Sequence, residues 1–116
     1  MNALTHDFND EDLQTFAHAI SQLPAPVKVT KPIDAAIMAR ASRLVEKYRC
    51  NFCHNDDFTG RDNVPRIASQ REDFLVKTLL EYKTNTRYGY DASMADVLAP
   101  VSEQEIRELA YYIARQ

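Results

Sequence analysis

The chain has 116 residues, of which 45% are hydrophobic and 27% are charged, a composition typical of one compact domain with a short accessory segment. Its formal net charge of −3 disfavours a nucleic-acid partner, which usually needs a basic surface. No apolar run approaches the roughly 18 residues of a membrane span, and no charged-then-apolar leader is visible, so any export signal is expected to have been removed.

The sequence predicts an all-α protein, because only two glycines occur and the β-branched residues do not alternate with polar ones. The first helix is expected to begin after Asn9, with Asp12 completing a capping box three residues later. Its apolar positions follow helical spacing at Leu13, Phe16, Ala17 and Ile20. The segment 24–32 contains three prolines and is typical of a stiff, extended linker.

A second helix is predicted over 34–48, with Asp34 as its N-cap. It leads directly into the sequence Cys-Asn-Phe-Cys-His at 50–54. A polar loop is expected from 55 to 68.

The last two helices each follow a predicted capping box. Ser69 and Glu72 form the first of these boxes, and that helix is expected to end near residue 83. A loop is predicted over 84–100. Ser102 and Glu105 form the second box, which begins the C-terminal helix.

The motif Cys50-Asn51-Phe52-Cys53-His54 is the attachment signature for c-type haem. Two thiols three positions apart can each bond to one of the two haem vinyl groups, and the adjacent histidine is then held as the proximal ligand of iron. The motif uses both cysteines of the chain. The sequence therefore predicts one covalent haem c bound through Cys50, Cys53 and His54.

Three other uses of the paired cysteines fit less well. A dithiol redox motif belongs to a βαβ setting, and no strand is predicted here. A structural zinc site needs four ligands, but only His6 and His18 remain, 12 residues apart on a different element. A disulfide between Cys50 and Cys53 would close a very small loop and stabilise the fold little.

Met94 is the candidate for the second axial ligand. It lies 40 residues after His54, ahead of the last helix, so the chain can wrap the haem and present the thioether from the opposite side. A Met/His pair leaves no open site and suits electron transfer. The alternative is that Met94 only fills the core, which is the better interpretation for Met38 inside the second helix.

The residue pattern of the N-terminal segment resembles that of the C-terminal segment. A shift of 93 residues sets Met1 on Met94, Phe8 on Val101, Asn9 on Ser102, Leu13 on Ile106, Ala17 on Ala110 and Ile20 on Ile113. Residues 1–23 are therefore predicted to be the tail of a preceding cytochrome domain, with 24–32 as the linker and 33–116 as the haem c domain. The alternative is a chance likeness between two amphipathic helices with similar caps.

The stretch 33–116 resembles the class I c-type cytochromes, most closely the bacterial cytochrome c4 group and its small single-haem relatives. The motifs that carry the resemblance are Cys50-Asn51-Phe52-Cys53-His54, Val64-Pro65-Arg66-Ile67-Ala68-Ser69-Gln70-Arg71, Leu79-Leu80-Glu81-Tyr82-Lys83, Thr86-Arg87, Met94-Ala95-Asp96-Val97-Leu98 and Leu109-Ala110-Tyr111-Tyr112-Ile113. Ala41, Asn55 and Asn85 depart from the pattern, because each stands where glycine is common. At Ala41 the departure implies a slightly wider crossing of the two terminal helices. Asn tolerates the left-handed conformation, so the turn at Asn55 remains possible.

The resemblance implies a class I cytochrome c fold, in which the first and last helices of the domain cross around one haem, here with an extra N-terminal helix. It implies that His54 and Met94 are the iron ligands and that the Pro65 carbonyl accepts the Nδ1–H of His54. Tyr82 and Arg87 are implied pocket residues, with helix packing and a solvated charge as their respective alternatives. The apolar shell of the haem is expected to include Ile67, Leu75, Leu79 and Val97.

The expected function is electron transfer by a periplasmic protein that is not an enzyme. Redox proteins would dock transiently at the haem edge through a small interface, with no nucleic acid or membrane span involved. A neighbouring cytochrome domain is a further possible partner. Two alternatives stay open: an electron-input domain of a larger multi-haem or enzyme assembly, and a gas- or peroxide-binding haem if Met94 is not a ligand.

Overall fold

The computed structural model describes residues 2–24, 32–87 and 92–116. The helices in these ranges are, in chain order, α1 (Asn2–Thr5), α2 (Asp10–Ser21), α3 (Ala35–Lys47), α4 (Cys50–His54), α5 (Glu72–Lys83), α6 (Ala92–Leu98) and α7 (Glu103–Ile113). The extended pairing in the described residues is a single bridge between Arg61 and Val64. The prediction of an all-α protein is confirmed. Within the described part of the chain, none of the helices is both long and apolar enough to cross a membrane.

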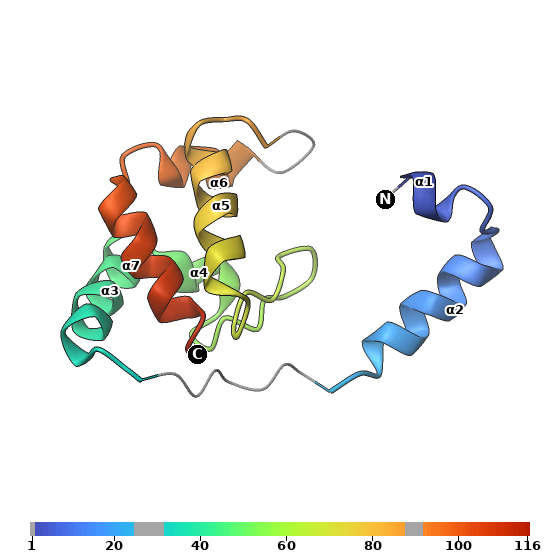
Figure 1. Cartoon of the computed structure of the whole chain (residues 1–116), viewed down its shortest axis with the longest axis horizontal. Coiled ribbons are helices and arrows are strands. Elements are labelled where there is room, and N and C mark those ends of the chain that lie inside the picture. Colours follow the sequence, from blue (N-terminus) through green and yellow to red (C-terminus); the bar gives the residue numbers. More distant parts are fainter. Residues whose placement is uncertain (1, 25–31, 88–91) are drawn as a thin grey trace.

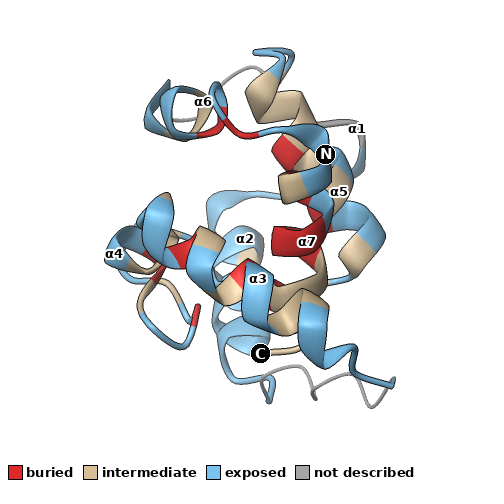
Figure 2. Ribbon diagram, turned by 90° about the vertical axis from the view of Figure 1, so that its left-hand side faces the viewer, coloured by how far each residue is buried: buried red, intermediate tan, exposed pale blue. Residues whose placement is uncertain are grey.

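The core forms where α7 packs against α3 on one side and α5 on the other (Figure 1). Buried residues are concentrated on α7, as Figure 2 shows, and Ile106 and Ala110 are fully shielded from solvent. Ala41 of α3 is equally buried. Small side chains on both helices allow the two backbones to approach closely. The first and last helices of the body formed by residues 33–116 thus pack together, as expected.

The start of α3 is fixed by its own cap and by α7. The Asp34 carboxylate accepts from the backbone N–H groups of Ala36 and Ile37, so the predicted N-cap is confirmed. Asp34 N also donates to the Tyr111 hydroxyl at 2.8 Å, and that hydroxyl donates to the Pro32 carbonyl at 3.3 Å. Tyr111 of α7 therefore holds the chain at the point where residues 32–34 enter the domain.

The start of α7 is the predicted capping box between Ser102 and Glu105. The Glu105 carboxylate also accepts from Lys47 Nζ at 3.0 Å and from the Tyr48 hydroxyl at 3.1 Å. These contacts lower the pKa of Glu105 to about 2, with the backbone N–H of Ser102 as the largest cause. One side chain therefore both caps α7 and connects it to the end of α3.

Two predictions about the helices were wrong. Ser69 does not cap the third predicted helix: it has a positive φ of 57°, its hydroxyl donates to the Gln116 carbonyl at 2.6 Å, and α5 begins after Arg71 instead. The loop predicted over 84–100 contains the helix α6, so Met94 lies on a helix. Residues 88–91 of that loop lie outside the described residues.

The N-terminal pair α1 and α2 stands apart from the body formed by α3 to α7 (Figure 1). In the described residues, neither helix contacts any of the others. The capping box of Asn9 and Asp12 is confirmed, and α2 begins 93 residues before α7. Yet α2 has no buried residue, and its apolar side chains Leu13, Phe16 and Ile20 are exposed. Most of the predicted linker, residues 25–31, lies outside the described part.

Candidate haem-binding site

The predicted attachment motif forms the short helix α4, which directly follows α3 and contacts it. Arg49, with φ 56° and ψ 35°, turns the chain between the two helices. Cys50 is half-buried, Cys53 is exposed, and both are free thiols. Burial raises the pKa of Cys50 to about 11, so the folded chain does not activate this thiol as a nucleophile at neutral pH.

His54, the last residue of α4, is the most buried member of the motif, with 6% of its surface exposed. Its Nδ1 lies 3.0 Å from the Pro65 carbonyl oxygen, which assigns the proton to Nδ1 in a neutral ring. Burial lowers the pKa of His54, and the Pro65 contact opposes this in part. A neutral imidazole with Nδ1 engaged leaves Nε2 as the nitrogen available to a metal.

The loop after α4 is shaped so that it presents the Pro65 carbonyl to His54. Gly60 N donates to the His54 carbonyl at 3.0 Å, and a Cβ at Gly60 would meet the Val64 carbonyl oxygen and lie 2.6 Å from the Pro65 carbonyl carbon. Gly60 also has a φ of 74°. Only glycine fits this close approach, so Gly60 supports the orientation of His54 although the sequence analysis did not name it.

Asn55 starts the same loop with φ 66° and ψ 164°. The positive φ agrees with expectation, but the ψ value puts the residue outside the left-handed helical region and in one that is essentially restricted to glycine. Its side chain compensates in part by donating to the Gly60 carbonyl at 2.7 Å. Asn85, the other predicted departure from glycine, also has a positive φ, of 53°.

The structure brings most of the predicted apolar shell into one cluster. Leu75 and Leu79 of α5 are buried. The half-buried side chains packed against the same core include Cys50, Ile67, Tyr82 and Met94. The predicted shell residue Val97 lies outside this cluster, because its side chain on α6 is 39% exposed.

The candidate ligand Met94 is carried by α6, which packs against α5. Both views place α6 above α4, and Figure 2 shows the two helices projecting on the same side of α7. The helix with Met94 and the helix with His54 therefore approach one region of the molecule from opposite ends. This arrangement suits ligation of one iron from two sides.

Tyr82 and Arg87 lie next to each other at the end of α5. The Arg87 guanidinium lies over the Tyr82 ring, 5.4 Å from its centre, and pairs with Glu81 at 3.2 Å. The Arg87 side chain is only 21% exposed, so it is not the solvated surface charge of the alternative interpretation.

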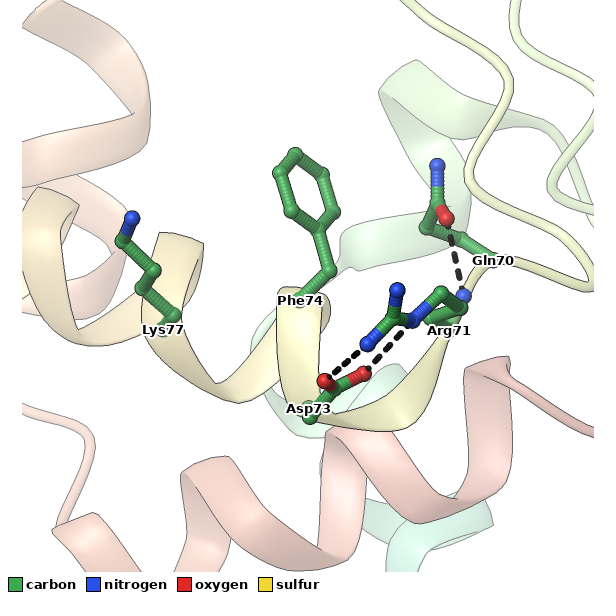
Figure 3. A pocket seen from close by; sticks show the side chains of 5 residues that line it. All are labelled: Gln70, Arg71, Asp73, Phe74 and Lys77. Carbon is green, nitrogen blue, oxygen red and sulfur yellow. Dashed lines mark hydrogen bonds and ion pairs between the residues drawn. The ribbon is translucent and has the colours of Figure 1, made fainter.

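Two pockets occur around the N-terminal turn of α5, away from these residues. The pocket in Figure 3 is lined by Gln70, Arg71, Asp73, Phe74 and Lys77, with Arg71 and Asp73 paired across it. The second pocket shares Arg71 and Asp73 and extends to α7. Neither is lined by a predicted site residue, and their charged walls do not suit a porphyrin.

Thr78 is a second residue that the sequence analysis missed. It is half-buried on α5, in line with Leu75, Leu79 and Tyr82 at the spacing of one helix face. The periodicity of these three neighbours was the signal that could have found it.

The zinc alternative gains no support, since among the described residues no group of three or more His, Cys, Asp and Glu side chains could hold a metal ion.

Comparison with known proteins defines the fold. Neither a family model nor a curated protein matches the sequence. The structure of reduced recombinant cytochrome c4 from Pseudomonas stutzeri matches with a TM-score of 0.84 and 23% identity, over 99% of this chain and 65% of that one. The Acidithiobacillus ferrooxidans cytochrome c4 structure matches with a TM-score of 0.78 and 18% identity, over 100% of this chain and 70% of that one.

The chain thus has the fold of the cytochrome c4 structures, and the predicted class I cytochrome c fold is confirmed. It spans 65% of the length of the Pseudomonas stutzeri protein. Because each alignment takes in almost the whole of this chain, it includes α1 and α2 as well as the body of α3 to α7.

Proposed function

We propose that this chain is an electron-transfer domain that carries one haem c, attached through Cys50 and Cys53 and ligated by His54 and Met94. The observation that carries the proposal is the buried His54 at the end of the Cys-x-x-Cys-His helix, with Nδ1 engaged by the Pro65 carbonyl. This is the geometry that a histidine needs in order to give Nε2 to iron. The shared fold with cytochrome c4 structures supports the same interpretation.

Each residue has a distinct task in this proposal. The thiols of Cys50 and Cys53 form thioether bonds to the porphyrin, and Pro65 fixes the ring orientation and donor strength of His54. Leu75, Leu79 and Ile67 exclude water, while Tyr82 and Arg87 complete the pocket wall. Val97 is too exposed to contribute to this apolar shell. Haem iron, when bound, supplies the one-electron couple between Fe(II) and Fe(III). The protein keeps both ligands fixed, so little rearranges when an electron moves.

The N-terminal segment 1–23 belongs to a preceding cytochrome domain in this proposal. Leu13, Phe16 and Ile20 of α2 are exposed, whereas the α7 residues 93 positions later, Ile106, Leu109 and Ile113, are at most 3% exposed. Both helices carry a capping box at the matching position. An exposed face with the pattern of a buried one is expected where a covering domain is missing. Segment 24–32 would then be the linker, and 33–116 the haem c domain.

The proposed setting is the periplasm, where redox proteins dock transiently at the haem edge and no reaction is catalysed. The exposed face of α2 also favours the related alternative, in which this chain is the electron-input part of a larger multi-haem assembly. A gas- or peroxide-binding haem would need an open sixth position, which Met94 would close.

The first test is expression in cells equipped for cytochrome maturation. The proposal expects a red protein with the mass of the polypeptide plus one haem that remains bound after denaturation. A colourless product with the mass of the bare polypeptide would overturn the proposal.

The second test is Met94→Ala, with Met38→Ala as a matched control, because Met38 is a half-buried methionine on α3. Met94→Ala is expected to abolish the weak long-wavelength sulfur–iron absorption, lower the reduction potential and permit carbon monoxide binding. Met38→Ala should change none of these. If the two variants behave alike, Met94 is not a ligand, and the gas-binding alternative gains.

A further inference from the structure

Thr78 carries a buried hydroxyl for which the described residues provide no partner. Its Oγ1 is shielded from solvent and forms no hydrogen bond with any of the described residues. A threonine inside a helix usually bonds the carbonyl four residues earlier, but this one does not. A buried hydroxyl left unpaired costs about 1–3 kcal/mol, so an acceptor is expected from a bound group or from a side chain that such a group repositions.

The position of Thr78 indicates where that acceptor lies. Thr78 follows Leu75 by three residues and precedes Tyr82 by four, so the three side chains share one face of α5. That face contributes to the cluster that also contains Met94 of α6. The hydroxyl is therefore on the wall that would face the porphyrin and its distal ligand.

We propose that Thr78 is a positioning residue of the haem site, whose hydroxyl donates a hydrogen bond to an electron-rich acceptor that comes within reach only when haem is bound. This inference rests on the proposed function. The acceptors available there are a haem propionate oxygen and the Met94 thioether sulfur. A hydrogen bond to either draws electron density away from the iron and favours Fe(II), so the hydroxyl raises the reduction potential.

The test compares Thr78→Val, which keeps the shape but removes the hydroxyl, with Thr78→Ser, which keeps the hydroxyl. Thr84→Val is the matched control, because the Thr84 hydroxyl already donates to the Leu80 carbonyl at 2.9 Å. Thr78→Val is expected to lower the potential, with about a threefold to tenfold smaller ratio of reduced to oxidised protein at a fixed ambient potential. Thr78→Ser and Thr84→Val should retain the wild-type potential.

Two further readouts identify the acceptor. A displaced sulfur–iron absorption band in Thr78→Val would identify the Met94 sulfur, whereas an altered pH dependence of the potential with an unmoved band would identify a propionate. Equal potentials for the Val and Ser variants would overturn the inference, whether both equal the wild type or both are lowered. Haem content, measured first in the wild type, tests the proposed function separately.

Discussion

Gly60 shows how one residue without a side chain can control the orientation of a proposed ligand, His54. Its backbone packs against the segment that presents the Pro65 carbonyl to His54. In Gly60→Ala, the added methyl group would meet the Val64 carbonyl oxygen at a φ of 74°, so the loop must move. We expect a loss of about 2–3 kcal/mol in the free energy of unfolding and a changed reduction potential.

Denaturant unfolding and a redox titration of the haem-loaded protein measure both effects. Asn63→Ala is the matched control, because Asn63 is exposed in the same loop. A Gly60→Ala variant with wild-type stability and potential would show that the loop does not orient His54.

Asn55 provides a test of backbone strain. Its φ of 66° and ψ of 164° lie where glycine is nearly the only residue found, and both Asn55→Gly and Asn55→Ala remove the same side-chain hydrogen bond to Gly60. The glycine variant should therefore be more stable than the alanine variant by about 1–3 kcal/mol. Chemical denaturation of both variants measures the difference, and equal stabilities would contradict the strained conformation.

At the scale of helices, the sequence predicts those starts that depend on neighbouring residues. The boxes at Asn9 and Ser102 need only a side chain and a backbone N–H three residues apart, and both form. Ser69 has the same local pattern, but its hydroxyl bonds to Gln116, which is 47 residues away. No local rule contains that partner, and the same holds for the Gly60 packing beside His54.

The contact between α3 and α7 is predicted to depend on pH through Glu105. Its pKa falls from the usual 4.5 to about 2 in the folded protein, because Ser102, Lys47 and Tyr48 donate to the ionised carboxylate. The resulting stabilisation is complete above pH 4.5 and is lost as the pH falls towards 2. We expect Glu105→Gln to lose about 2 kcal/mol at neutral pH, allowing for solvent screening.

Unfolding curves of the wild type and of Glu105→Gln, recorded between neutral and acid pH, should therefore converge in the acid range. Glu103→Gln is the matched control on the same helix, because Glu103 is 69% exposed and pairs with Arg107 only at 3.9 Å. A stability difference that persists unchanged below the ordinary glutamate pKa would mean that the charge of Glu105 does not connect the helices.

At the scale of the whole molecule, the chain combines a helical body that has its own core with a helix pair that packs against no other described helix. The body of α3 to α7 has its own core, and in the described residues neither α1 nor α2 contacts it. The Tyr111 hydroxyl forms hydrogen bonds with Pro32 and Asp34, where the chain enters the body. The stability of the body of α3 to α7 should therefore not depend on residues before Pro32.

This independence can be tested with two truncations of the haem-loaded chain. A protein of residues 32–116 should keep the thermal midpoint and reduction potential of the full chain, because it retains the Tyr111 contacts and the Asp34 cap. A protein of residues 36–116 lacks both features and should be less stable by about 1–2 kcal/mol. If the first truncation costs as much as the second, α2 packs on this haem domain, and its apolar face is not that of a preceding domain's last helix.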